Sequence, residues 1–232
     1  MPDSDALPRR ALAAMAAGAL LLPGCSLPGA RSGGDAEVSA VEDLMREHGV
    51  LRRALVVYDR LADRLGAGDA RFDARALGET AQLFRDFGED YHERMLEEAF
   101  IFPRVRKAGG SAAAAADILG RQHDRGREIT DYILAACRDG VIGSGIAAPL
   151  GRALRGMVVM YQAHAANEDT VVFPAWRAAI SPAAYKDIGE QFEAIEKKVF
   201  GQDGFEAANA RMAKLEQRLG CGDLSTFTAP AA

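Results

Sequence analysis

The chain has 232 residues, of which 49% are hydrophobic and 26% charged, and its formal net charge is −5 at pH 7. This length can form one large domain or two small ones, and it can bury a sizeable core. The negative balance and the lack of a basic stripe argue against a nucleic-acid-binding protein. Alanine and leucine dominate while β-branched runs are few, which predicts an all-α protein.

The first 36 residues are typical of an export signal and a flexible tether rather than of folded structure. Arg9 and Arg10 precede an apolar stretch at residues 11–22, which is too short for a membrane-spanning helix. The arginine pair resembles a twin-arginine (Tat) signal. The letters LPGC resemble a lipobox, in which Cys25 would carry a lipid. We therefore expect an exported protein that is periplasmic or lipid-anchored to the membrane facing the periplasm; the alternative is a disordered apolar tail.

Apolar residues recur at helical spacing in four long stretches of the chain. They predict long helices at residues 38–66, 74–107, 111–139 and 145–179. Ser111 is expected to cap the third of these helices. Because the connections between the four helices are short, we expect an antiparallel up-and-down four-helix bundle.

Two further helices are predicted after the bundle. Ser181 and Pro182 combine an N-cap with a first-turn proline, so a fifth helix should begin there and run to about residue 199. A short sixth helix should follow, and both should pack on the outside of the bundle. The predicted organisation is signal and tether at 1–36, bundle at 37–180, C-terminal helices at 181–220 and tail at 221–232.

Two pairs of short segments repeat within the chain. REHGVLR at 46–52 is similar to RQHDRGR at 121–127, and EEAFIFP at 97–103 is similar to EDTVVFP at 168–174. We interpret the chain as two helical hairpins, each with a histidine on its first helix and a histidine with acids on its second. Such periodicity indicates a pseudo-twofold bundle. The proline that closes each cluster is expected to bend or end its helix.

The chain has four histidines, and one falls on each predicted bundle helix. A single histidine on an apolar face is more often a hydrogen-bonded core residue. Several buried imidazoles and carboxylates are costly, however, unless each is paired or bound to a metal. Four helices that each aim a histidine inward, two of them with an acid about one turn away, match the way helix bundles hold metal ions. The pattern therefore favours a metal centre over a merely polar core.

The combination of imidazole and carboxylate suits iron, manganese or zinc, and six ligands in two sets favour a pair of irons. The predicted ligands share an inward orientation and are His48, His92, Glu97, His123, His164 and Glu168. Asp169, five residues after His164, is a rival to Glu168.

This order of residues, with Phe-Pro closing each cluster, resembles the hemerythrin-like (HHE cation-binding) family over residues 40 to about 220. The resemblance implies a four-helix bundle with a non-haem di-iron centre that binds or reacts with oxygen. It also implies that the four histidines are terminal ligands and that Glu97 and Glu168 bridge the metals.

The chain departs from the oxygen-carrying members of that family on the third helix. Those members have a second histidine one turn after the first, and here Arg127 stands at that position. One iron would then have a more open coordination sphere, or it would recruit Glu93 as a substitute ligand. An open position favours reaction with small molecules over reversible carriage alone.

The spacing of His92 and Glu97 is a second departure. Five residues correspond to roughly 140° around an ideal helix, so both side chains face the centre only if the helix carries an extra residue. A π-bulge supplies one, and we expect it between about residues 90 and 98, with none between 162 and 170. The alternative is a regular helix in which Glu93 and Glu97 are the ligands and His92 lies outside them.

Three functions are compatible with these residues. The first is an exported di-iron protein that binds or reacts with oxygen, peroxide or nitric oxide. The second is a non-catalytic iron store or a metal- or oxygen-sensing module, and the third is a bundle with a zinc-stabilised core. The sequence leaves open whether the protein is an enzyme.

Cys137 and Cys221 are the cysteines that follow the predicted signal. They have neither CxxC spacing nor a histidine nearby, which argues against a thiolate metal site. In an oxidising compartment the two could form a disulfide.

Overall fold

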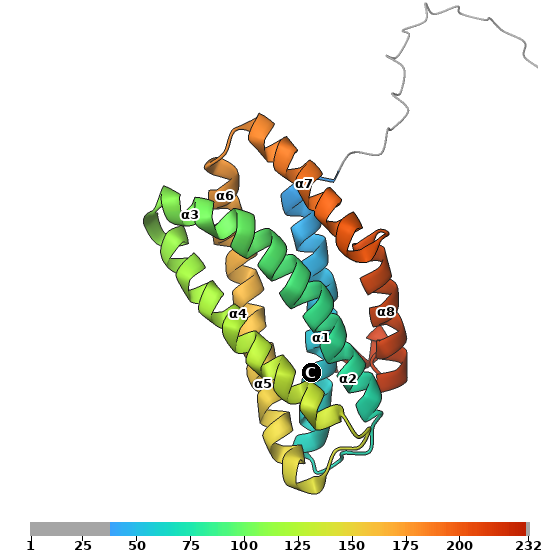
Figure 1. Cartoon of the computed structure of the whole chain (residues 1–232). Helices are drawn as coiled ribbons and strands as arrows, with labels where there is room; N and C mark the ends of the chain where they lie inside the picture. Colours follow the sequence, from blue (N-terminus) through green and yellow to red (C-terminus); the bar gives the residue numbers. More distant parts are fainter. Residues whose placement is uncertain (1–37, 231–232) are drawn as a thin grey trace, which may run out of the picture. The chain divides into compact units, whose positions relative to one another are not determined.

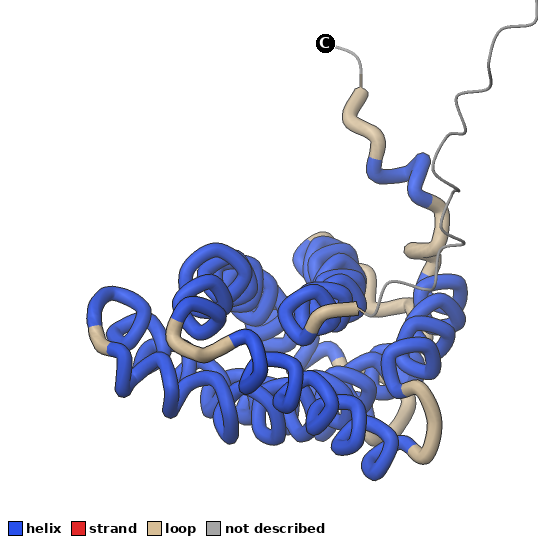
Figure 2. The backbone as a smooth tube through the Cα atoms, turned by 90° about the horizontal axis from the view of Figure 1, so that it is seen from above, coloured by secondary structure: helices blue, strands red, loops and turns tan. Residues whose placement is uncertain are grey.

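The computed structural model describes residues 38–230 of the chain. Within that range the protein is helical, with short connecting loops and no β-strand (Figure 2). No helix in the described part is both long and apolar enough to cross a membrane. The expected export signal, the tether and Cys25 lie outside the described residues.

The elements from α1 to α6 make up four long helical stretches, which form the body of this part and can be followed in Figure 1. The first is α1 and the third is α4, whereas the second and fourth each contain a π-helical segment between two α-helical ones. Their bounds are α1 Ala40–Gly66, α2 Ala74–Leu83, η1 Phe84–Ile101, α3 Phe102–Ala108, α4 Gly110–Cys137, α5 Ser144–Asn167, η2 Glu168–Val172 and α6 Phe173–Ala178. The four predicted helices are therefore confirmed to within about two residues at each end.

The chain then forms α7 (Pro182–Phe200), α8 (Gly204–Leu219) and a short 3-10 helix, η3 (Leu224–Phe227). The Ser181 side chain accepts a hydrogen bond from the Ala184 N–H at 3.2 Å, which confirms the predicted N-cap. Helix α7 packs against α1 and η1, and α8 packs against α1 and α2.

The start of α4 differs from the prediction. Ser111 lies inside the helix, and Gly109 is the single residue between α3 and α4. Gly109 has φ 81° and Gly110 has φ 75°, both in the left-handed region. Glycine adopts that region at little cost, so the tight link needs these two glycines rather than a serine cap.

The second long stretch contains the expected wide turn. The π-helix η1 covers all of residues 90–98 and extends well beyond them on the N-terminal side. The expectation of regular helix up to residue 170 is wrong. Helix α5 is regular through Asn167, but η2 begins at Glu168. The N–H of Phe102 bonds the carbonyl of Glu97, and the N–H of Phe173 bonds that of Glu168, so both halves share an i→i+5 turn after the glutamate.

The prolines that close the two clusters do not end their helices. Pro103 and Pro174 each stand in the first turn of the α-helical segment that follows a π segment. These segments, α3 and α6, continue to Ala108 and Ala178. A proline is best tolerated in a first turn, where the missing N–H costs least.

The long stretches surround one core, because α1 and α4 both pack against α5, and α4 packs against α2 and η1. Large apolar side chains fill most of it, among them Trp176, Tyr58 and Phe84. Polar groups are buried in the same core. Those with ionisable side chains are Glu47, His48, Glu89, His92, Glu93, Glu97, His123, His164 and Glu168. So many buried ionisable groups require partners or bound cations. Cys137 and Cys221 are both buried and free, so the possible disulfide is absent.

Candidate metal centre

The four histidines meet in two pairs inside the bundle. The Nε2 atoms of His48 and His92 lie 3.0 Å apart, and those of His123 and His164 lie 3.1 Å apart. Each of the four residues is at most 3% exposed. The helices α1 and η1 supply the first pair, and α4 and α5 supply the second. The wide turn of η1 thus brings His92 to the other histidines, as expected for a bulged helix.

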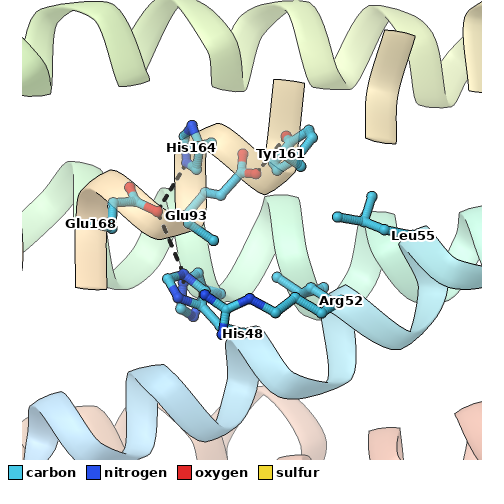
Figure 3. Close-up of a pocket in the computed structure, with 10 residues that line it drawn as sticks. His48, Arg52, Leu55, Glu93, Tyr161, His164 and Glu168 are labelled. Carbon is cyan, nitrogen blue, oxygen red and sulfur yellow. Dashed lines mark hydrogen bonds and ion pairs between the residues drawn. The ribbon is translucent and has the colours of Figure 1, made fainter. Parts of the chain in front are cut away.

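Two buried glutamates lie between the histidine pairs. Glu168 Oε2 is 3.4 Å from His48 Nε2 and 3.0 Å from His164 Nε2 (Figure 3). Glu97 Oε1 is 3.4 Å from His92 Nε2, and its Oε2 is 3.4 Å from His123 Nε2. Each carboxylate therefore lies against one histidine of each pair, which is how a carboxylate that bridges two cations is placed.

The outer nitrogen of every histidine donates to an oxygen acceptor. The donor and acceptor residues are His48 and Asp169 at 2.7 Å, His92 and Glu47 at 2.5 Å, His123 and Glu98 at 2.9 Å, and His164 and Gln122 at 3.0 Å. An acceptor at Nδ1 places the hydrogen there and leaves the Nε2 lone pair facing the centre. All four imidazoles are thus oriented for metal coordination through Nε2.

These outer contacts follow the internal repeat and support a pseudo-twofold arrangement. Glu47 and Gln122 directly precede the first histidine of each half, and Glu98 and Asp169 directly follow the central glutamates. Arg52 bonds Asp169, and Arg127 bonds Glu98 at 2.5 Å. These partners were not predicted, although the repeated segments contain them at equivalent positions.

The two rival acids lie outside the ring of histidines and central glutamates. Asp169 contacts the outer nitrogen of His48, so Glu168 is the acid at the centre. Glu93 accepts a hydrogen bond from the Tyr161 hydroxyl at 2.7 Å, and its other oxygen is 3.3 Å from Arg127. The geometry therefore favours His92 over Glu93 as a ligand.

The central glutamates provide the clearest test of whether these residues fit a metal. All four carboxylate oxygens of Glu97 and Glu168 are buried, and none has a hydrogen-bond partner in the described part of the chain. Their close polar neighbours are the histidine nitrogens at 3.0–3.4 Å, and a cation bound between these groups would offset the cost of burying the carboxylates. Donor atoms of Glu97, His123, His164 and Glu168 lie within 4.8 Å of one another, and so do those of His48, His92 and Glu97. The donor set can hold metal cations.

Electrostatics also couples the imidazoles and carboxylates. Burial alone lowers the pKa of His92, but Glu97 and Glu47 outweigh it and raise that pKa well above its usual value. Burial raises the pKa of Glu168, yet His164 and His48 lower it well below its usual value. Because ligand nitrogens must be deprotonated, metal binding has to displace protons from this centre.

A small pocket opens beside the centre between α1, η1 and α5 (Figure 3). On one side its wall consists of the central groups His48, His92, His164 and Glu168. The rest of the wall comes from Leu51, Arg52, Leu55, Glu93, Tyr161 and Ala165. The pocket leaves room for about one water-sized molecule next to the candidate metal site.

The chain is similar to proteins of one known family. Residues 39–176 match the model of the hemerythrin HHE cation binding domain. Uncharacterized proteins from Mycobacterium bovis and Mycobacterium tuberculosis are 40% identical to this chain over 227 residues, covering 94% of this chain and 88% of theirs. No solved structure is significantly similar to it.

Proposed function

This chain belongs to the hemerythrin HHE cation-binding family, and we propose that it holds two iron ions in a non-haem centre. The proposed ligands are the six groups that converge in the bundle, namely His48, His92, Glu97, His123, His164 and Glu168. One observation carries the proposal: each central glutamate spans both histidine pairs with no other partner for its oxygens. The proposal includes the antiparallel up-and-down order of the four helical stretches, which their short connections support.

When bound, an iron pair supplies reversible binding or reduction of oxygen, peroxide or nitric oxide. The chain's own residues orient and shield that centre. The Nδ1 acceptors hold each imidazole in one tautomer, and Glu97 and Glu168 balance the charge of two cations. Leu51 and Leu55 in the pocket wall present apolar surface to an entering molecule, which suits a small neutral ligand.

A residue that cannot bind metal stands one turn after the histidine of α4, and this favours reaction with a small molecule over reversible carriage alone. Arg127, one turn after His123, points its guanidinium at Glu93 and Glu98 and supplies no ligand atom. A metal held by His123 and His164 would therefore have one protein ligand fewer and an open coordination position. Six ligands in two sets suit an iron pair better than manganese or zinc.

An optical experiment tests this function. The protein loaded anaerobically with ferrous iron should develop absorption bands of a coupled iron pair on exposure to oxygen or peroxide. Zinc-loaded protein is the control, because zinc has no redox chemistry and gives no such bands. An iron store or a metal-sensing module would take up iron but show no defined spectral response to these molecules. That outcome would contradict the proposed reaction.

We also propose that the protein acts outside the cytoplasm, with Cys25 as a lipid anchor. The proposal rests on Arg9, Arg10 and the apolar residues 11–22, all outside the described part of the chain. Export of a folded protein would let iron enter the centre in the cytoplasm, away from metals that bind such ligands more tightly.

A further inference from the structure

The pseudo-twofold symmetry of the centre is broken beside the pocket. Glu93 directly follows His92, whereas Ala165 directly follows His164 at the equivalent position. Glu93 is 1% exposed and lines the pocket together with His164 and Glu168. One half of the molecule therefore has an additional buried carboxylate next to the proposed ligands, and carboxylates bind iron well. This acid is placed to compete with any external ligand.

Two side chains hold Glu93 away from the histidine nitrogens that face the centre. Its Oε1 accepts a hydrogen bond from the Tyr161 hydroxyl at 2.7 Å (Figure 3). Its Oε2 is 3.3 Å from an Arg127 nitrogen and 3.9 Å from the outer nitrogen of His123. Arg127 is fixed in turn by Glu98. Both oxygens of Glu93 are thus engaged by groups other than the histidine Nε2 atoms and the central glutamates.

Helix α4 is shaped to admit this tyrosine. At Gly126 a methyl group would overlap the Tyr161 hydroxyl, so glycine is the residue that leaves room for it. Gly126 directly precedes Arg127. One turn of α4 therefore leaves space for the Tyr161 hydroxyl and also supplies the Arg127 guanidinium. The Tyr161 ring is also packed edge-on against Phe84, with centroids 5.0 Å apart. The phenol has little freedom to leave Glu93.

We propose that Tyr161 and Arg127 restrain Glu93 so that it does not coordinate the metal pair, and thereby keep one coordination position free for a small external ligand. The inference rests on the proposed iron pair. Tyr161, Arg127 and Gly126 are positioning residues in this account, because they act through Glu93. Once the restraint is removed, the Glu93 carboxylate enters the free position and competes with the ligand.

Azide, a small anion that binds ferric iron, is the probe for this inference. Its affinity for the iron-loaded protein is measured by optical titration in the wild type and in Tyr161→Phe. Loss of a hydrogen bond to a charged group should weaken azide binding by about tenfold or more, because the freed carboxylate now competes. The double variant Tyr161→Phe with Glu93→Ala should regain wild-type affinity. Iron should also leave Tyr161→Phe more slowly in the presence of a chelator, since the metals gain a ligand.

Tyr58→Phe is the matched control. The Tyr58 ring is fully buried, its hydroxyl has no hydrogen-bond partner in the described residues, and it does not line the pocket. Azide affinity should be unchanged in this variant. Gly126→Ala should weaken azide binding as Tyr161→Phe does, because the added methyl group displaces the Tyr161 hydroxyl while the tyrosine itself is kept. It replaces Tyr161→Phe if the latter does not fold.

The outcomes separate this inference from the proposed function. If Tyr161→Phe keeps two irons and binds azide as tightly as the wild type, the restraint is wrong while the iron pair stands. If affinity falls and the Glu93→Ala double variant does not recover, Glu93 is not the competitor and the inference also fails. A wild-type protein that binds no iron overturns the proposed function, and the inference falls with it.

Discussion

Phe102 is stacked on His123, with the two ring centroids 5.3 Å apart and the ring planes 15° apart. The other half of the chain repeats this contact, since Phe173 is stacked on His48 at 5.5 Å and 21°. In both cases the phenylalanine of a Phe-Pro pair covers a histidine from the opposite hairpin. The aromatic-proline motif therefore joins the two hairpins and shields one imidazole of each histidine pair.

Replacing these rings should weaken both the fold and the metal site. We expect Phe102→Ala and Phe173→Ala to lower the free energy of unfolding by about 3–5 kcal/mol and to reduce bound iron. Urea unfolding followed by circular dichroism and elemental analysis measure the two effects. Phe192→Ala, which removes a buried ring on α7, should destabilise the protein but leave its iron content unchanged. Full iron content in Phe102→Ala would argue against the shielding role.

The acids that accept from the outer histidine nitrogens should tune metal affinity without binding metal. Asp169→Asn and Glu98→Gln remove the negative acceptors of His48 and His123, so each should lower iron affinity by about 10–100-fold. Competition with a chelator measures this affinity. Asp90→Asn, which alters an exposed acid paired with Arg94, is the control and should behave as the wild type. Equal affinity in all of these variants would show that the outer acids do not position the ligands.

Glu89 should make stability depend on pH. It is buried, accepts from the Thr130 hydroxyl at 2.5 Å and lies 2.9 Å from Arg85 Nε. Burial is the main cause that raises its pKa from 4.5 to about 7. A carboxyl group whose pKa is higher in the folded than in the unfolded state favours folding at low pH. The free energy of unfolding therefore falls as pH rises from about 4.5 to about 7, and it falls no further from this cause above that range.

Glu89→Gln cannot ionise and should lack this pH dependence. The fall in unfolding free energy between pH 5 and pH 8 should be smaller than in the wild type by about 2–3 kcal/mol. Urea titrations at the two pH values measure it. Glu128→Gln, which alters an exposed acid on α4, should keep the wild-type difference. An unchanged pH dependence in Glu89→Gln would mean that folding does not raise the pKa of Glu89.

The export proposal is tested on the first residues of the chain. Replacing Arg9 and Arg10 by lysine should leave the protein in the cytoplasm, because a twin-arginine signal requires both arginines. Cell fractionation measures the distribution. Mass spectrometry of the mature protein should detect a lipid on Cys25, and Cys25→Ala should abolish it. Normal export of the double-lysine variant would rule out this route.

Much of the centre could be predicted from the sequence because it depends on periodicity. One histidine on each helix and two repeated acid clusters are enough to place His48, His123 and His164 on inward faces. The five-residue spacing after His92 also indicated the π-helical turn. By contrast, η2 was missed, since His164 and Glu168 fit a regular helix and the extra residue comes only after them.

The contacts of Tyr161 were harder to predict for a different reason. They depend on how α4 and α5 are rotated relative to η1, and helical spacing within one element does not contain that information. Gly126 shows this clearly, since in the sequence it is an unremarked glycine inside a helix. Its role follows only from the position of the Tyr161 hydroxyl.

The metal content of the purified mature protein tests the central claim most directly. After expression in iron-rich medium, elemental analysis should find two metal ions per chain, chiefly iron, because each of the two central glutamates lies against one histidine of each pair. His123→Ala and His164→Ala should each lose most of that metal. One ion per chain, a predominance of zinc, or wild-type metal content in both variants would contradict the account.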